Sequence, residues 1–194
     1  MKIEAGFPEA DRLRVAALFW EAFSGKLGRL LAPEDKALRF IASALNSDHA
    51  LCAVSGEGVL LGVAGFKTAT GGLITAGFGD MARVYGLLGA AWRGPLLDLL
   101  DRPLGDGQLL MDGIFVTCAA RGQGIGSALI AAVMAEAARR GMAEVRLDVV
   151  DSNPRARALY ERIGFTPTEQ KELGIFSRLF GFRHATTMSL RLPG

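Results

Sequence analysis

The sequence predicts a single α/β domain, of the α+β kind, in which helices flank a central sheet. The chain has 194 residues, a length at which one domain buries a substantial core. Half of the residues are hydrophobic, and they occur in short runs that glycine or charged residues interrupt. Segments with strand-like spacing alternate with segments with helical spacing along the chain, which is typical of a sheet covered by helices.

The first quarter of the chain predicts one strand and two helices. Residues 2–7 suit a strand, and a helix follows from Pro8 with apolar residues at spacings of three and four. We expect residues 24–28, which contain two glycines, to interrupt this helix near its end. Pro33 suits the first turn of a second helix over residues 34–45, which begins with acidic residues.

A hairpin and an inserted segment come next. Residues 49–54 and 59–67 have strand-like composition on either side of the turn 55–58. Residues of about 69–107 then form an apolar stretch dotted with glycine, in which periodicity predicts a pair of helices. The periodic residues are Met81, Val84, Leu87, Leu88 and Trp92, followed by residues 96–100. Such an insertion can have a function, either as a wall over a ligand pocket or as a dimer contact. It can also be a packed addition to the surface without a function of its own.

A strand, a helix, a second strand and a short helix follow in order. Residues 109–116 suit a strand, and residues 124–140 suit an alanine-rich helix that Gly141 ends. Residues 143–150 alternate between apolar and polar, which predicts a strand with one buried face. Asn153 and the proline after it provide the N-cap and first residue of the short helix.

The last part of the chain predicts two further strands. Residues 165–170 and 183–192 are expected to pair as an antiparallel couple that closes the sheet. The connection between them, residues 171–182, has no clear pattern.

The glycine-rich loop Arg121-Gly122-Gln123-Gly124-Ile125-Gly126 joins the strand 109–116 to the alanine-rich helix. Glycines let backbone N–H groups approach a ligand closely. The first N–H groups of the helix have no partner within it, and the helix dipole favours negative charge there. The loop therefore suits a phosphate or pyrophosphate, with Arg121 adding positive charge. Since glycine-rich turns before helices are common, a purely structural role for the loop also stays open.

Two familiar phosphate-binding loops are excluded. A Walker A loop ends in Gly-Lys-Ser/Thr, whereas Gly126 is followed directly by Ser127. A dinucleotide-binding loop has the spacing Gly-x-Gly-x-x-Gly, whereas the spacing here is Gly-x-Gly-x-Gly.

The loop and its flanks resemble the GCN5-related N-acetyltransferase (GNAT) family. Residues 121–126 match that family's acyl-CoA motif, Arg/Gln-x-x-Gly-x-Gly/Ala. The family's second hallmark is matched by Asn153, Ala156, Leu159-Tyr160 and Gly164-Phe165. The two motifs lie at the family's usual separation, with a helix and a strand between them. The strong resemblance covers residues of about 108–169.

The resemblance implies one GNAT-type domain over residues 1–194. Its sheet would be mixed, largely antiparallel and splayed between the fourth and fifth strands, with a helical insertion at about 69–107 and an acetyl-CoA-binding core at about 108–169. The implied reaction is direct transfer of an acetyl group from acetyl-CoA to a primary amine of a small molecule or peptide. The implied coenzyme-binding residues are Phe115, Val116, Arg121, Gly122, Gln123, Gly124, Ile125, Gly126, Ser127 and Asn153.

The resemblance also implies two catalytic residues. Tyr160 matches the position of a phenol that protonates the coenzyme sulfur, although a tyrosine there also suits simple packing. Asp112 is the acidic residue nearest the family's catalytic carboxylate in the fourth strand, where this chain has Gly113. In a regular strand this offset of one points Asp112 to the opposite face. Asn153 serves equally well as a plain N-cap.

Charge and composition exclude several classes of binding partner and location. A net charge of +2 does not suit a dedicated nucleic-acid binder, which usually carries clustered Lys and Arg. No apolar run approaches the roughly 18 residues of a membrane helix, and the N-terminus lacks an apolar signal core, so we expect a cytoplasmic protein. Cys52 and Cys118 suit free, buried thiols in a reducing compartment. His49 and His184 lack metal-ligand spacing, so we expect no metal.

Three alternatives stay open. The chain could transfer a longer acyl chain, because its insertion is apolar, or it could bind acyl-CoA as a non-catalytic sensing module. A homodimer that forms through the apolar insertion is also open. The identity of the acceptor depends on loops that the sequence specifies least.

Overall fold

The computed structural model describes residues 1–98, 103–174 and 177–193. Seven strands form one sheet in the order β1-β2-β3-β4-β5-β7-β6. The pair β4 and β5 is parallel, and the other neighbours are antiparallel. The predicted mixed, largely antiparallel sheet is confirmed. The strands are β1 (Lys2–Ala5), β2 (Ala50–Val54), β3 (Leu60–Lys67), β4 (Gln108–Val116), β5 (Glu144–Val150), β6 (Thr166–Glu172) and β7 (His184–Arg191).

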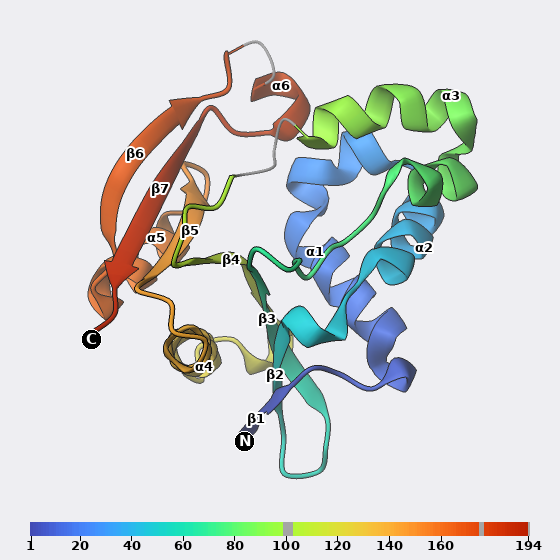
Figure 1. Cartoon of the computed structure of the whole chain (residues 1–194). Helices are drawn as coiled ribbons and strands as arrows, with labels where there is room; N and C mark the ends of the chain where they lie inside the picture. The colour runs from blue at the N-terminus through green and yellow to red at the C-terminus, as the bar shows by residue number, and fades with distance from the viewer. Residues whose placement is uncertain (99–102, 175–176, 194) are drawn as a thin grey trace.

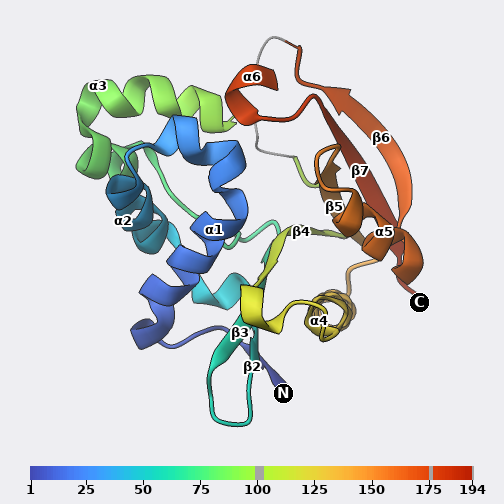
Figure 2. The ribbon, with the colours of Figure 1, turned by 180° about the vertical axis from the view of Figure 1, so that it is seen from behind.

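Helices cover both faces of this sheet (Figure 1). Three helices, α1 (Arg12–Leu31), α2 (Glu34–Ala44) and α3 (Phe78–Asp98), gather on one side. On the other lie α4 (Ile125–Arg139) and α5 (Pro154–Ile163), as Figure 2 shows from behind. The short helix α6 (Ser177–Phe180) packs near α1. The 3-10 turns among the described residues include η1 (Glu9–Asp11), η2 (Ser47–His49) and η3 (Cys118–Ala120).

Each face of the sheet has its own core. The core under α1, α2 and α3 includes Val15, Ile41 and Phe115. The core under α4 and α5 includes Leu129, Val133 and several strand residues. Alternation in β5 explains the division, since Val145, Leu147 and Val149 pack toward α4 and α5 whereas the residues between them face the other way.

The two central strands separate part of the way along the sheet. In β4, residues 108–111 pair with residues 144–147 of β5, and the pairing ends at Met111 and Leu147. Beyond this point the strands diverge, which leaves one edge of β4 without a neighbouring strand. We call this place the fork. The splay predicted between the fourth and fifth strands is therefore present.

The interruption expected within the first helix is wrong. Helix α1 continues through residues 24–28 to Leu31. Leu30 and Leu31 are buried at its end, and burial of two such side chains outweighs the roughly 1 kcal/mol that each helical glycine costs. Gly181, which follows α6, packs closely against this helix, because an added side-chain carbon at Gly181 would lie only 3.0 Å from the carbonyl oxygen of Gly25.

The inserted segment contains a helix pair, but the break lies earlier than expected. Helix α3 has one non-helical residue, Gly86, with φ of 75°, and it continues through Pro95 to Asp98. Part of the expected second helix, residues 99–102, lies outside the described residues. Leu87 and Leu88 are exposed, although the apolar periodicity predicted that they belong to the buried face of the helix.

Other boundaries agree with the sequence. Asn153 caps α5 by accepting a hydrogen bond from the N–H of Ala156, and Gly164 ends that helix in the left-handed region. Gly141 follows α4 with φ of 70°. His49 belongs to η2 and not to the second strand, which begins one residue later.

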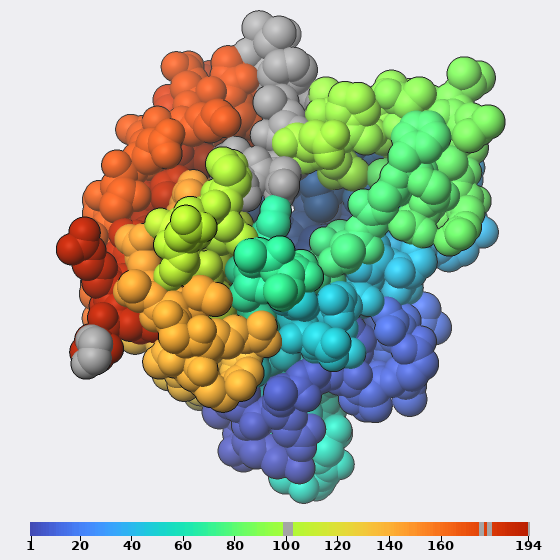
Figure 3. All heavy atoms as spheres, in the orientation of Figure 1, coloured from blue at the N-terminus to red at the C-terminus, as the bar shows by residue number. Residues whose placement is uncertain are grey.

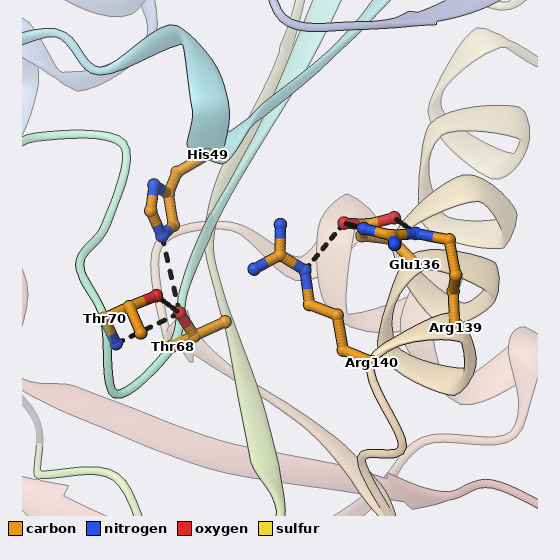
Figure 4. Close-up of polar contacts among 6 residues, drawn as sticks. All are labelled: His49, Thr68, Thr70, Glu136, Arg139 and Arg140. Atoms are coloured by element: carbon orange, nitrogen blue, oxygen red, sulfur yellow. Dashed lines mark hydrogen bonds and ion pairs between the residues drawn. The ribbon is translucent and has the colours of Figure 1, made fainter.

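His49 is a buried group whose protonation should weaken the fold. Its Nε2 lies 3.4 Å from Thr68 Oγ1 (Figure 4), and its Nδ1 lies 3.1 Å from Asn46 Nδ2. Burial lowers the pKa of His49, the positive charge of Arg140 lowers it further, and Asp48 acts in the opposite direction. Glu136 holds Arg140 in place through an ion pair of 2.6 Å.

We expect stability to fall as the pH drops below about 6.5, the ordinary pKa of histidine. The folded state binds this proton less readily than the unfolded state, so the loss continues down to the folded pKa and then levels off. It amounts to at most about 1.4 kcal/mol per pH unit. Urea unfolding of the wild type and His49→Gln between about pH 7.5 and 5 measures it. An equal pH dependence in both proteins would remove the role of His49.

Candidate active site

The glycine-rich loop takes the conformation that its glycines permit. Gly122 and Gly124 both have φ of 79°, and Gly124 is the N-cap of α4. An added side-chain carbon at either position would meet no atom within 4 Å, so the space above the loop is free of protein. Gly126 lies at ordinary contact distance from Leu159 of α5. Ile125 is buried and anchors the loop, whereas Ser127 is exposed.

The backbone of this loop carries unused hydrogen-bond donors. Within the described part of the chain, none of the N–H groups of residues 122–127 donates a hydrogen bond. The Gln123 side chain folds back and donates to the carbonyl oxygen of Ala119 at 3.2 Å. Six adjacent N–H groups without acceptors at the start of a 15-residue helix have the chemistry that anions prefer.

Arg121 is engaged by protein groups. Its Nε donates to the carbonyl oxygen of Val116 at 3.1 Å, and its guanidinium pairs with Glu21 of α1 at 2.9 Å. The exposed Cys118 donates to the same Glu21 carboxylate at 2.9 Å, so the expectation that this thiol is buried is wrong. Cys52 is buried, as expected. Arg121 therefore links the end of β4 to α1. The positive charge that we expected at the loop is paired with the carboxylate of Glu21.

A β-bulge decides which way Asp112 points. Met111 pairs with Phe66 of β3, and Gly113 pairs with Gly65, which leaves Asp112 as an extra residue. Both Asp112 and Gly113 therefore lie on the face of the sheet beneath α1. The orientation that regular alternation predicts for Asp112 is wrong, because the bulge shifts the alternation by one residue.

Phe23 fills the place of the missing side chain at Gly113. An added side-chain carbon there would lie 2.5 Å from Phe23 Cζ, so the ring lies directly against the strand. The ring is held by Phe19, with centroids 4.6 Å apart, and by the edge of Phe115 at 6.2 Å. Phe115 is buried in this aromatic cluster, and its neighbour Val116 packs toward α4.

We expect Gly113→Ala to destabilise the protein by about 1–3 kcal/mol, the usual cost of overpacking a well-packed site. Phe23→Ala should remove much of that penalty in the double variant, giving a coupling free energy of at least about 0.5 kcal/mol. Urea unfolding of the wild type, both single variants and the double variant measures it. Additive effects would show that Phe23 does not occupy the position.

A cavity of about 1000 Å³ opens at the fork. Figure 3 shows it as a hollow between α3 and the segment of residues 67–78, with α1 behind it. The bulge residues Asp112 and Gly113 and the ring of Phe23 line it. Trp20, on the same helix as Phe23, is buried in the core.

Tyr160 lies on the other face of the sheet, in the core beneath α4 and α5. Its ring contacts the edge of Phe165, with centroids 6.0 Å apart. None of the described residues forms a hydrogen bond with its hydroxyl. Burial raises the pKa of Tyr160 to about 12, so the phenol keeps its proton throughout the physiological range.

Sequence reasoning missed four charged residues of the cavity, namely Lys26, Lys67, Asp98 and Asp148, of which Asp148 and Lys26 have the most informative surroundings. Asp148 follows directly after the last paired residue of β5, and it accepts a hydrogen bond from Thr187 at 2.6 Å. Lys26 of α1 lines the cavity with its ammonium over the rings of Phe23 and Phe182. Burial lowers the pKa of Lys26, and Asp148 acts in the opposite direction. Two features of the sequence could have pointed to these residues. Lys26 is a charged residue within the apolar stripe of a helix, and Asp148 is a carboxylate on the polar face of a strand.

Comparison with known proteins agrees with this arrangement. The profile of the acetyltransferase (GNAT) family matches residues 13–165, and the chain belongs to that family. N-acetyltransferase 8F1 of Rattus norvegicus is 36% identical over 97 residues, which cover 50% of this chain and 42% of that protein. The match therefore spans less than half of the length of that relative.

Solved structures share the fold. Ribosomal-protein-alanine N-acetyltransferase from Brucella melitensis superposes with a TM-score of 0.64 at 20% identity, over 99% of this chain and 100% of that one. N-acetyltransferase from Staphylococcus aureus Mu50 gives 0.64 at 17% identity, over 98% and 100%. Identities this low demonstrate a common fold alone.

The described residues contain no helix that is long and apolar enough to cross a membrane. They also contain no group of three or more His, Cys, Asp or Glu side chains placed to hold a metal ion.

Proposed function

We propose that this protein is an N-acetyltransferase that moves an acetyl group from acetyl-CoA directly to a primary amine of a small molecule or peptide. One observation carries the proposal: the six N–H groups of residues 122–127 have no acceptor within the described chain and lie at the start of α4. We further propose that residues 1–194 are one domain, with the insertion at about 69–107 forming part of the acceptor pocket and the coenzyme-binding core at about 108–169.

The residues of the loop suit the pyrophosphate of coenzyme A. The backbone N–H groups of Gly122, Gln123, Gly124, Ile125, Gly126 and Ser127 would donate to it, and the helix dipole would favour its charge. Arg121 would contribute if a phosphate displaced Glu21, and otherwise holds β4 against α1. Asn153, which is the N-cap of α5, would also contact the coenzyme.

The open edge of β4 suits the pantetheine arm. From Asp112 onward this strand has β3 on one side and no neighbour on the other. Backbone groups of Phe115 and Val116 would bind the arm there, as a further strand binds a sheet edge. Acetyl-CoA supplies the acetyl thioester, and the fork directs it toward the cavity.

Few protein groups are needed for the transfer. The neutral acceptor nitrogen forms a bond to the thioester carbon, the bond from carbon to sulfur breaks, and the products are an amide and a free thiol. Asp112 would receive the amine proton, directly or through water, because the bulge places it in the cavity. Tyr160 would stabilise the departing sulfur by donating its phenolic proton, which its raised pKa keeps in place.

Release of free thiol tests the proposal. Purified protein is mixed with acetyl-CoA and a panel of primary amines, and thiol formation and the acetylated amine are measured together. Turnover that depends on both substrates supports an acetyltransferase. Tight binding of acetyl-CoA without thiol release for any amine would identify a non-catalytic binding module. Preference for a longer acyl thioester, which the apolar cavity also suits, would change the donor and leave the reaction class intact.

A further inference from the structure

The cavity at the fork has two chemically different sides. Charged side chains come mainly from the sheet, namely Lys67, Asp112 and Asp148, with Lys26 beside them on α1. The opposite side is built by α1, α2 and α3 from apolar side chains. We call this side the helical wall, and it consists of Leu27, Leu31, Phe40, Ile41, Met81 and Leu97.

The helical wall provides little for a polar ligand group. Among the described residues of α1, α2 and α3 that line the cavity, Lys26 and Asp98 carry charge, and Asp98 is the exposed last residue of α3. Phe40, Ile41 and Met81 are almost completely buried in the core beneath these helices. A charged group placed against this wall would lose its hydration without gaining an ion-pair partner there.

We propose that the helical wall binds the apolar body of the acceptor, and that the acceptors are monoamines with a long alkyl or aryl body. Polyamines and amino sugars are then poor substrates. This inference rests on the proposed acetyl transfer and names the acceptor class of that same site. The amino group would lie at the charged side of the cavity, beside Asp112, and the body would extend toward α2 and α3.

Two physical terms set the selectivity. Each methylene group transferred from water to an apolar site contributes about 0.8 kcal/mol, which corresponds to roughly fourfold in affinity. A second ammonium at the far end of the acceptor would face the apolar side chains of the helical wall, where the described helix residues offer a carboxylate only at the solvent-exposed end of α3, Asp98. A longer chain should therefore raise the affinity for a monoamine. A second positive charge at the end of that chain should cancel much of this gain in affinity.

The apolar chain could instead belong to the acyl donor. A long acyl group would reach the cavity through the same fork and contact the same side chains. The two possibilities differ in which substrate, the amine or the acyl-CoA, gives faster turnover when its chain is lengthened. Under our proposal a longer amine improves turnover with acetyl-CoA, whereas a longer acyl-CoA competes with a long amine for the cavity.

The test uses the full-length protein and primary alkylamines with four, six and eight carbons. The matched probe is the eight-carbon diamine, which differs from octylamine only by a second terminal amino group. The ratio kcat/KM is measured through thiol release, and amine binding in the presence of coenzyme A is measured by calorimetry. We expect octylamine to exceed butylamine by at least about 20-fold and the diamine by at least about 10-fold in both measurements.

A pair of variants on one helix localises the effect. Leu27→Glu places a carboxylate in the helical wall and should reverse the preference toward the diamine. Leu13→Glu adds the same charge at an exposed position of α1 outside the cavity and should leave the preference unchanged. If Leu27→Glu does not fold, the amine series on the wild type still decides the question.

The outcomes separate this inference from the proposed function. Equal activity and binding for octylamine and the diamine, or turnover that improves with acyl length and not with amine length, would overturn the inference while leaving acetyl transfer intact. Absence of thiol release with every amine would overturn the proposed function. Calorimetry would then still report whether the cavity prefers the long monoamine, and no such preference would overturn the inference as well.

Discussion

Gly124→Asp is expected to weaken acetyl-CoA binding by about 100-fold relative to Gly124→Asn, a difference of about 2.7 kcal/mol. Gly124 has φ of 79°, and both asparagine and aspartate tolerate this left-handed conformation better than other side chains do. The two side chains have the same shape, and no atom lies within 4 Å of the added carbon. The variants therefore differ mainly in the negative charge that aspartate places among the N–H groups proposed to hold the pyrophosphate.

Calorimetric titration of acetyl-CoA into the wild type and both variants measures this difference. Gly124→Asn is the matched control for backbone strain, and thermal unfolding confirms that the variants are equally folded. The difference should shrink as salt is added, because an exposed charge is screened within roughly 10 Å at moderate ionic strength. Equal affinities for the two variants would mean that the loop is a structural turn and that the anion site lies elsewhere.

Asp112→Asn is expected to lower kcat by about 100-fold while leaving the affinity for acetyl-CoA unchanged. Asparagine preserves the size of the side chain and the bulge, but it cannot accept the proton of the attacking amine. Asp112 lines the cavity beside the fork, where the amine must approach the thioester. The affinity should persist because the backbone of the loop, and not Asp112, is proposed to bind the coenzyme.

The measurement is the rate of thiol release from about pH 6 to 9, together with calorimetry of acetyl-CoA. Asp148→Asn is the control, since Asp148 is the other carboxylate beside the end of the β4–β5 pairing and also lines the cavity. A large loss in Asp148→Asn alone would move the proton acceptor to that residue. An unchanged rate in Asp112→Asn at every pH would leave no role for Asp112 in proton transfer.

The conformation of the glycine-rich loop and both ends of α5 could be predicted from sequence because their signals are local. The loop 121–126, the cap at Asn153 and the terminating Gly164 each depend on backbone conformations that a few neighbouring residues dictate. Their spacing along the chain also carried the family resemblance, which the profile match confirmed. Local conformational preferences of glycine and asparagine hold in almost any tertiary context, so these predictions were confirmed.

Predictions about helix continuity were less successful because packing outweighs small local costs. The glycines near the end of α1 suggested a break, but burial of Leu30 and Leu31 keeps the helix intact. In α3 the break falls at Gly86 and not before the residues around Pro95. A preference of about 1 kcal/mol per residue is readily overridden by contacts with another element.

The sequence by itself determined the family, since two motifs and their spacing carry the resemblance, and the resemblance in turn implied the mixed sheet. Only the tertiary structure decided that Asp112 faces the cavity, that Arg121 is held by Glu21, and that Phe23 covers Gly113. Each of these depends on residues far apart in the chain that the sheet and α1 bring together. The cavity at the fork belongs to the same group, because its charged and apolar sides exist only where β4 and β5 separate beneath three helices.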